Sequence, residues 1–440
     1  MSEESTPSID DNFSDYKPLF TNGSALVEAN RCLFCYDAPC TIACPTSIDV
    51  PRFIKKISSR NLKGAAKTIL DANILGASCA RICPTEELCE GACVLNDLHG
   101  RPIKIGRLQR YATESVVIED TRELLFEKAP SNGKKVALIG AGPSSLGCAT
   151  ELAKLGYDCV CFDKNEKAGG LNTYAIADYK LSYKTAVKEL EWIDQLGVEI
   201  RSNTRVGKDV SMESLINDYD AIFLGIGLAG VGPISIPGED LEGVMDCLDF
   251  IRELKTQPKE SVSLKGKSVA VLGGGNTAID AVTQSCRLDA DKVYLVYRRT
   301  RDKMGAYTHE QELALHDGGV FVLEKQPVEI KGDGKVEALV CAQTRSENGK
   351  LIITDELSTL KVDLVLRATG QSKHTSFLSE VGIKLSDWNT PIVDENGKTS
   401  HEKIWSGGDC VSGGQEVVNA VAEGKRAAED IHNTLMKGKQ

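Results

Sequence analysis

Eight cysteines are gathered near the start of this 440-residue chain, between residues 32 and 93. The first four follow the pattern Cys-x2-Cys-x4-Cys-x3-Cys, and the second four follow Cys-x3-Cys-x5-Cys-x3-Cys. The eight positions are Cys32, Cys35, Cys40, Cys44, Cys79, Cys83, Cys89 and Cys93. Thiolates are preferred ligands of soft metals, and eight of them match the needs of two four-ligand centres. The spacing therefore predicts two metal centres.

Clustered cysteines serve disulfides, zinc sites or iron–sulfur clusters. Disulfides are disfavoured, because residues 1–20 are polar and acidic and lack the basic start and apolar run of a secretory signal. Structural zinc favours separate Cys-x2–4-Cys pairs, whereas both groups here continue through four cysteines. Pro45 and Pro84 follow cysteines, as proline follows the last cysteine of bacterial ferredoxin runs. We therefore expect two [4Fe-4S] clusters, with a zinc-stabilised, non-enzymatic redox sensor as the alternative.

Charge and hydropathy limit the expected partners. The chain has a formal net charge of −11, whereas nucleic acids and anionic membrane surfaces attract basic proteins. The sequence contains no run of 18 apolar residues, so no transmembrane helix is expected. We expect a cytoplasmic protein of two or three domains, since a domain has about 100–200 residues.

A glycine-rich turn lies between an expected strand at residues 136–139 and a helix that begins at Pro143. In dinucleotide-binding folds such a turn directs the backbone N–H groups of the helix start at a pyrophosphate. Asp163 follows the next expected strand, at the position of an acid that binds a ribose hydroxyl. The expected contacts are Gly140, Ala141, Gly142, Pro143, Ser144, Ser145 (in place of the third glycine) and Asp163.

Three later segments favour FAD as this dinucleotide. Gly170 and Leu171 follow the acid and can pass close to the cofactor, and residues 222–227 return a strand to the same place. Gly408 and Asp409 precede a helix that is expected to begin near residue 416. An aspartate there can bind the ribityl or phosphate end of a flavin, and the helix start can stabilise negative charge on the reduced ring.

A second turn of the same kind follows an expected strand at residues 268–272. Its expected contacts are Gly273, Gly274, Gly275, Asn276 and Thr277, and Ala278 replaces the third glycine. After the next strand, at residues 293–297, Arg298 and Arg299 stand in place of the acid. Two arginines suit the 2′-phosphate of NADP(H) better than the free ribose of NAD(H). We expect NADP(H) here, with NAD(H) as the alternative.

These sites require an α/β fold with an added helical part. Among residues 21–125, helices are expected after Asp49 as N-cap with Pro51 in the first turn, at 65–72 and at 105–117. The first 20 residues are expected to be loosely attached, and residues 127–134 to form a linker. From Lys135 onward strands alternate with helices, as in doubly wound folds. The expected order is an α-helical iron–sulfur domain at 1–130, a FAD-binding domain split into 131–246 and 366–440, and an inserted Rossmann-like NAD(P)H-binding domain at 247–365.

With these motifs in hand, the chain from about Asn30 onward resembles the glutamate synthase small-subunit flavoprotein family. Its cysteine-rich part resembles more closely the N-terminal half of dihydropyrimidine dehydrogenases and their separate bacterial subunits of the PreT type. The strings NRCLFCYDAPC, ACPTSID, LGASCARICPTEELCEGAC and IGRLQRYATE carry this resemblance. The resemblance implies that one cluster is held by Cys32, Cys35, Cys40 and Cys93, and the other by Cys44, Cys83, Cys89 and Gln109. Spacing alone would favour Cys79 over Gln109 as the eighth ligand.

One segment departs from the family pattern. Relatives carry Ile-Pro-x-Phe-Arg-Leu-Pro near the flavin, where this chain reads AIADYKLSY. Lys180 takes the place of the arginine, and Ser182 takes that of the second proline. The resemblance implies that Lys180 contacts the flavin, with the positive charge retained but without the forked geometry of a guanidinium.

The resemblance also implies an activity. NAD(P)H would reduce FAD, and FAD would pass single electrons to the two clusters, with no side chain needed as a catalytic acid or base. The sequence shows no β/α barrel and no third phosphate-binding motif after the flavin segments. We therefore expect a heteromer with an FMN-containing subunit that reduces uracil or thymine. The alternatives are the small subunit of NADPH-dependent glutamate synthase and an electron-transfer subunit of another reductase.

Overall fold

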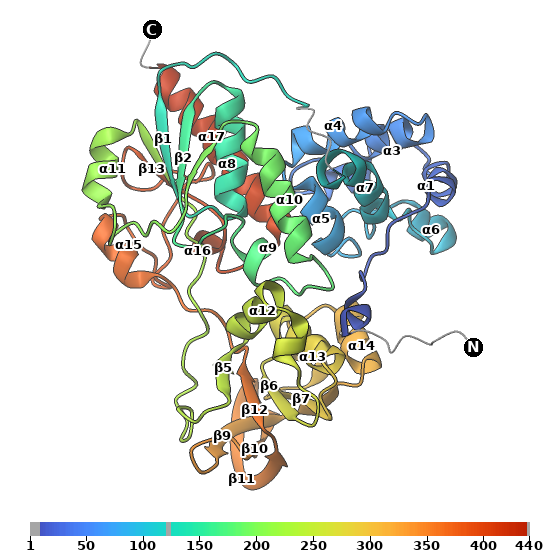
Figure 1. The fold of residues 1–440 in the computed structure, drawn as a ribbon, viewed down its shortest axis with the longest axis vertical. Coiled ribbons are helices and arrows are strands. Elements are labelled where there is room, and N and C mark those ends of the chain that lie inside the picture. Colours follow the sequence, from blue (N-terminus) through green and yellow to red (C-terminus); the bar gives the residue numbers. More distant parts are fainter. Residues whose placement is uncertain (1–8, 120–124, 438–440) are drawn as a thin grey trace. The chain divides into compact units, whose positions relative to one another are not determined.

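The computed structural model describes residues 9–119 and 125–437, which divide into two compact units (Figure 1). Among these residues, the first unit comprises 9–15, 174–182 and 229–372. The second unit comprises the remainder, namely 16–119, 125–173, 183–228 and 373–437. Each unit contains a five-stranded parallel sheet of its own.

The cysteine-rich segment of the second unit is helical. Its elements are α1 (Asn22–Ala29), α2 (Pro39–Ile42), α3 (Val50–Ser58), α4 (Leu62–Ala72), α5 (Gly76–Ile82), α6 (Leu95–His99), α7 (Ile105–Thr113) and the π-helical turn η2 (Glu114–Ile118). The predicted cap of α3 is confirmed, because the carboxylate of Asp49 accepts a hydrogen bond from Arg52 N at 3.1 Å, and Pro51 lies in the first turn. The helices predicted at 65–72 and 105–117 are also present.

The apolar faces of these helices form the core of the helical part. Phe53, Ile54 and Ile57 of α3 are buried together with Leu108 and Ala112 of α7. Burying one such large side chain stabilises a fold by about 1.5–3 kcal/mol. The cysteine loops border the same core, so the packing of the helices fixes the loops in place.

A five-stranded parallel sheet forms the other part of the second unit. Its order is β13 (Ile404–Ser406), β4 (Ala221–Leu224), β1 (Lys135–Ile139), β2 (Asp158–Phe162) and β3 (Glu199–Arg201). β13 pairs in parallel with β4 although it lies near the far end of the chain. The C-terminal segment therefore returns to the sheet that begins at residue 135.

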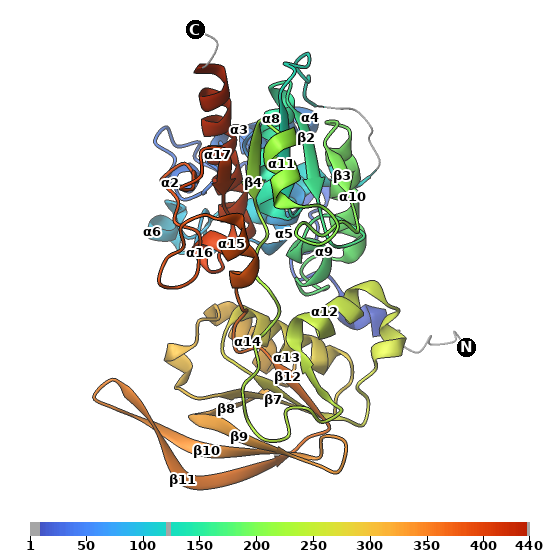
Figure 2. The same ribbon diagram turned by 90° about the vertical axis from the view of Figure 1, so that its left-hand side faces the viewer.

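Helices cover this sheet, and two of them pack especially closely. The helices are α8 (Pro143–Lys154), α9 (Leu171–Tyr174), α10 (Tyr183–Asp194), α11 (Met212–Asp218), α15 (Thr375–Val381), α16 (Asp409–Ser412) and α17 (Val417–Lys437). Figure 2 shows α17 beside α8, and the two helices make extensive contacts. Glycines permit this approach, since a Cβ on Gly147 would lie 2.9 Å from the carbonyl oxygen of Val421.

The first unit contains a second five-stranded parallel sheet and a three-stranded antiparallel sheet. The parallel order is β5 (Val244–Asp246), β12 (Leu364–Arg367), β6 (Ser268–Leu272), β7 (Lys292–Tyr297) and β8 (Val320–Leu323). The antiparallel sheet has β9 (Lys325–Lys331), β10 (Ala338–Glu347) and β11 (Lys350–Lys361). The helices are α12 (Cys247–Thr256), α13 (Asn276–Arg287) and α14 (Thr308–His316), with the 3-10 turns η1 (Ile9–Phe13), η3 (Lys259–Val262) and η4 (Arg301–Lys303).

The inserted unit is larger than the predicted range 247–365. β5 pairs with β12, and β12 pairs with β6, so both flanking segments belong to the inserted sheet. Its central segment spans 229–372. Pairing between parallel strands that lie far apart in the sequence leaves no local pattern, which is why the sequence placed these boundaries too far inward.

Two short segments from other parts of the chain also belong to the first unit. Residues 174–182 are held there by Lys255, whose ammonium donates to Ile176 O at 2.9 Å and to Leu181 O at 2.7 Å. Near the start, Phe13 is buried and Asn12 Nδ2 donates to Arg287 O at 3.1 Å. The predicted loose attachment is therefore wrong for this stretch, and residues 1–8 lie outside the described residues.

Within residues 9–119 and 125–437, no helix combines the length and the apolar character that a membrane span requires.

Replacing Gly424 with alanine tests the close packing of α8 and α17. The added Cβ would overlap the carbonyl oxygen of Ser144 and lie 2.9 Å from Cys148 N. We expect thermal unfolding to show a loss of about 1–3 kcal/mol, although alanine is the better helix former by about 1 kcal/mol. Gly23→Ala in α1, where no atom lies within 4 Å, is the control and should not destabilise the protein. Equal stability of Gly424→Ala and the parent would contradict the packing.

Candidate functional site

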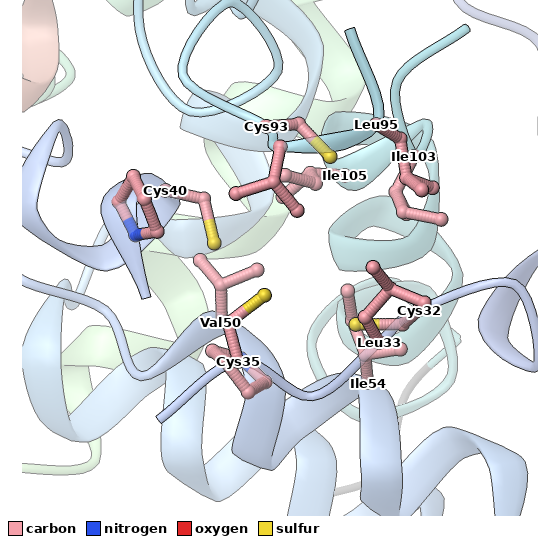
Figure 3. Close-up of a pocket in the computed structure, with 13 residues that line it drawn as sticks. Cys32, Leu33, Cys35, Cys40, Val50, Ile54, Cys93, Leu95, Ile103 and Ile105 are labelled. Atoms are coloured by element: carbon pink, nitrogen blue, oxygen red, sulfur yellow. The ribbon is translucent and has the colours of Figure 1, made fainter. Parts of the chain in front are cut away.

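Four cysteines from both sequence groups line one pocket in the helical part. They are Cys32, Cys35, Cys40 and Cys93, and apolar side chains such as Leu33 and Ile105 complete the wall. Figure 3 shows their sulfur atoms turned toward a common space. Cys93 is the last cysteine of the second run in the sequence, and it returns to the three cysteines of the first run, as the resemblance implied. The four residues implied for one cluster are therefore together.

The chemistry of this pocket fits a cluster of several metal ions. Burial raises the pKa of Cys32, and burial with the nearby thiols of Cys32 and Cys93 raises the pKa of Cys40 to about 11. Such thiols become thiolate ligands only when a cationic centre compensates the charge. In the described part of the chain, no three His, Cys, Asp or Glu side chains meet closely enough to hold a single ion. The sulfurs surround a space instead.

The second group, namely the three cysteines that the resemblance implies for the other cluster, consists of Cys44, Cys83 and Cys89, and Cys83 directly follows α5. Burial raises the pKa of Cys89, and the charges of Glu90, Cys83 and Cys44 raise it further. The thiol of Cys83 donates a hydrogen bond to Cys79, and this bond together with burial raises the pKa of Cys83. Cys44 and Cys83 thus lie close enough to Cys89 for their charges to act on it, and Cys79 is hydrogen-bonded to Cys83.

Gln109 is also attached to α5. Its side chain on α7 is 7% exposed, and its Nε2 donates to the carbonyl oxygen of Gly76, the first residue of α5, at 2.8 Å. This orientation leaves the amide oxygen as the atom that could bind a metal. Both candidates for the eighth ligand, Gln109 and Cys79, thus depend on the position of one short helix.

A lysine beside the second group was missed in the sequence. Lys17 donates from its ammonium to Cys83 O at 2.7 Å, and its charge lowers the pKa of Cys83 against the effect of burial. Lys17 is itself held by Arg110, which donates to Lys17 O at 2.5 Å. No sequence signal marked this residue, because it lies well before the first cysteine in a stretch without pattern.

The first glycine turn has the geometry that a pyrophosphate needs. Gly140 has φ +86°, and a Cβ there would lie 2.5 Å from Gly225 O. Gly142 is the N-cap of α8 and Pro143 its first residue. A Cβ on Gly170 would lie 3.0 Å from the Cα of Gly142. The glycines thus leave room for a bound group over the start of α8.

Two side chains next to this turn also fit a bound dinucleotide. The buried carboxylate of Asp163 accepts hydrogen bonds from Ala141 N and Asn165 N, both at 2.8 Å, and so braces the turn. Within the described residues, the hydroxyl of Ser145 is buried and has no hydrogen-bond partner. An unsatisfied donor at a helix start fits a site that receives an anionic group.

The C-terminal flavin segment returns to the same turn. Gly408 has φ +78°, and a Cβ there would lie 2.7 Å from Ser144 Oγ. Burial raises the pKa of Asp409, which accepts from Gln415 N at 3.1 Å. Glu423 of α17, which the sequence did not reveal, accepts from Gly408 N at 2.5 Å. The flavin contacts predicted at residues 140–145 and at residues 408–409 therefore lie together.

The second glycine turn opens α13 in the first unit. Gly273 has φ +141°, and a Cβ there would overlap Ala368 O. Gly275 is the N-cap of α13, and Asn276 accepts a hydrogen bond from Tyr307 N at 3.0 Å. The remaining predicted contacts, Gly274 and Thr277, belong to the same turn. Arg298 and Arg299 follow β7 and are exposed.

Lys180 lies in the first unit, between two carboxylates. Its ammonium is 2.7 Å from Asp280 and 2.6 Å from Glu310. Burial alone would lower the pKa of Lys180, but Asp280, Tyr179 and Glu310 together raise it well above its ordinary value. Its ion pairs therefore join residues 174–182 to α13 and α14, whereas the resemblance implied a flavin contact.

Comparisons with known proteins agree with this geometry. Residues 9–121 match the model of dihydropyrimidine dehydrogenase domain II with its 4Fe-4S cluster, and residues 111–424 match the model of pyridine nucleotide-disulphide oxidoreductases. The chain belongs to the pyridine nucleotide-disulphide oxidoreductase family. It is an oxidoreductase with FAD, NAD(P) and 4Fe-4S clusters as its cofactors.

The sequence similarity to known relatives extends over nearly the whole chain. It is 35% identical over 442 residues to the glutamate synthase [NADPH] small chain of Halomonas elongata, covering 96% of this chain and 92% of the relative. It is 33% identical over 419 residues to the NAD-dependent dihydropyrimidine dehydrogenase subunit PreT of Escherichia coli K12, covering 95% and 96%. FprA from Mycobacterium tuberculosis in complex with NADPH shares the fold, with a TM-score of 0.59 and 20% identity over 71% of this chain and 86% of FprA. The resemblance seen in the sequence is confirmed.

Separate alanine variants of Cys79 and Gln109 identify the eighth ligand. We expect Gln109→Ala to lose or alter one cluster, with iron content falling by up to about half, and Cys79→Ala to keep both. Iron analysis and the EPR spectrum of the reduced protein measure this. Cys286→Ala, a partly buried cysteine in α13 of the first unit, is the control. Loss of a cluster in Cys79→Ala alone would contradict the assignment to Gln109.

Proposed function

We propose that this protein is an electron-transfer subunit that oxidises NAD(P)H and passes electrons through FAD and two [4Fe-4S] clusters to a partner subunit. The observation that carries the proposal is the apolar core shared between the cysteine-rich helices and the helices of the flavin sheet. Leu70 and Ile74 of the cysteine-rich part pack in one cluster with Leu146, Trp192 and Val421 of the sheet part. The cysteine groups are thus built onto the flavin-binding part rather than joined by a linker.

Charge interactions support an order for the relay. Lys425 of α17 donates to Ala72 O of the helical part at 2.6 Å. Burial lowers the pKa of Lys425, and the charge of Cys44 opposes this as a smaller effect. Glu416, just before α17, adds a small upward effect to the pKa of Cys83, which its hydrogen bond with Cys79 and burial raise. α17 follows Asp409, a predicted flavin contact, so the second cysteine group is the one beside the flavin-binding residues. The charges that act on the thiols of Cys32 and Cys40 come from cysteines of their own pocket. The proposed path runs from the flavin to the second group, then to the first group and out.

FAD, when bound, accepts two electrons together and can release them singly, which suits clusters that take one electron each. The chain's own residues position it. The turn at Gly140 and Gly142 receives the pyrophosphate, Asp163 braces that turn, and Asp409 is placed for the ribityl or phosphate end. No side chain has to move a proton, so the protein contributes binding, orientation and charge.

The proposed partner is an FMN-containing subunit that reduces uracil or thymine. The match of residues 9–121 to a dihydropyrimidine dehydrogenase domain supports this choice, as does the 33% identity to PreT. The second candidate is the large subunit of glutamate synthase, favoured by the 35% identity to a glutamate synthase small chain. Copurification from native cells separates the two, because the copurifying subunit can be identified by mass spectrometry and assayed for uracil reduction or for glutamate synthesis.

The isolated chain is the test of the proposed role. With NAD(P)H it should reduce artificial one-electron acceptors such as ferricyanide, and it should leave uracil unreduced until a partner is added. Absorbance of the acceptor and of uracil measures the two reactions. Uracil reduction by the purified chain alone would overturn the proposal, and so would a colourless, zinc-containing preparation.

Alanine at both Arg298 and Arg299 tests the choice of nicotinamide cofactor. Losing charged hydrogen bonds of about 1.5–3 kcal/mol should lower kcat/KM for NADPH by roughly 10–100-fold and leave that for NADH nearly unchanged. Arg345→Ala is the matched control, because Arg345 is an exposed arginine of the same unit that pairs with Glu347 at 2.8 Å. Equal losses with both cofactors would contradict a 2′-phosphate contact.

A further inference from the structure

A buried carboxylate joins the flavin-binding part to α5, the helix that contains Cys79 and is followed by Cys83. Glu189 lies on α10 and is 1% exposed. Its Oε1 accepts a hydrogen bond from Ala77 N at 2.8 Å, and its Oε2 accepts one from Ser78 N at 3.1 Å. The hydroxyl of Ser78 also donates to Oε2. All three donors belong to the first turn of α5.

The position of α5 matters because both eighth-ligand candidates and Cys83 depend on it. Cys79 lies within α5, Cys83 follows its last residue, and Gln109 donates to Gly76 O at its start. At 1.5 Å per residue, Cys83 lies about 10 Å along the axis from Gly76. A shift of α5 would therefore move the second cysteine group relative to the flavin-binding residues.

An ion pair also holds α5. Arg81 is 3% exposed at its side chain, pairs with Glu114 at 2.5 Å and donates to Ala77 O at 2.8 Å. Arg81 and Glu114 both belong to the helical part, so this pair fixes α5 within that part only. Glu189 supplies the polar attachment to α10, and Trp192 on the same helix supplies the apolar one.

A charge at this place acts on the nearby cluster as well as on the fold. Burial raises the pKa of Glu189, while the hydrogen bonds from Ser78 and Ala77 and the charge of Arg81 oppose that effect by favouring the carboxylate. Dissolved salt screens exposed charges over a Debye length of roughly 10 Å, but it screens buried charges far less. A negative charge near a cluster disfavours the added electron.

We propose that Glu189 is a positioning residue for the second cluster, fixing α5 against the flavin-binding part and setting the reduction potential of the centre held by Cys83. This inference rests on the proposed electron relay. It adds a residue that binds no cofactor and that no sequence motif marks.

The experiment uses the full chain as purified with its flavin and clusters. Glu189→Gln keeps the shape, removes the charge and presents an NH2 group to backbone donors that cannot pair with it. We expect iron content to be unchanged and EPR-monitored redox titration to show one cluster shifted to a higher potential. The other cluster should keep its potential. Stopped-flow reduction with NAD(P)H should show slower appearance of the reduced cluster signal.

Two further variants keep the proposal falsifiable. Glu191→Gln removes an exposed carboxylate from the same helix, where it pairs with Lys188 at 3.0 Å, and should change neither potential. Glu189→Asp keeps the charge and should hold the potential close to that of the parent. If Glu189→Gln does not fold, Glu189→Asp carries the test through its rate: the shorter carboxylate cannot reach all three donors and should slow cluster reduction, and a rate equal to that of the parent would overturn the inference.

The outcomes separate this inference from the function on which it rests. Unchanged potentials for both clusters in an iron-replete Glu189→Gln protein would overturn the inference, and equal iron loss in the Gln and Asp variants would reduce Glu189 to a structural contact and overturn it as well. Failure of the parent protein to reduce its own clusters with NAD(P)H would instead overturn the proposed function.

Discussion

The interleaving of the two cysteine groups is the constraint on which the helical part depends. Cys93 joins Cys32, Cys35 and Cys40 in one pocket, so the chain from residue 44 to residue 93 must leave the pocket and return to it. Helices α3, α4 and α5 fill this excursion, and the apolar faces of α3 and α4 form part of the core that the cysteine loops border. Because burial keeps these thiols protonated without metal, cluster binding and the stability of this part are coupled.

The same excursion brings the second group to the flavin-binding sheet. α4 and α5 supply one half of an apolar core, and α8, α10 and α17 supply the other half. α17 in turn presses on α8 through Gly424 and Gly147, and α8 begins at the pyrophosphate turn. The packing thus connects the thiols of the second group to the turn that receives the flavin through contacts between adjacent helices.

Local signals in the sequence identified the elements that bind cofactors, and long-range contacts escaped them. The turn from Gly140 to Pro143 and the cap at Asp49 are determined by a few neighbouring residues, so their patterns predicted the structure. The resemblance implied that Lys180 contacts the flavin, whereas the partners that the structure gives it, Asp280 and Glu310, lie 100 and 130 residues away. Lys17 and Glu189 were missed for the same reason, since each acts on a group that is remote in sequence. The cysteine pairing across the two groups came from resemblance, because spacing left the eighth ligand open.

Buried charges in this protein occur where segments distant in sequence meet. Glu189 holds α5 to α10, Lys180 holds residues 174–182 to α13 and α14, and Lys255 caps the same segment through two carbonyl groups. Apolar side chains of similar volume would often give equal or greater stability at such places. A buried charge, however, tolerates only the arrangement that satisfies all of its hydrogen bonds, whereas an apolar contact tolerates sliding. Electron transfer requires fixed spacing between centres, so a protein that carries it gains more from joints of this kind than from additional stability.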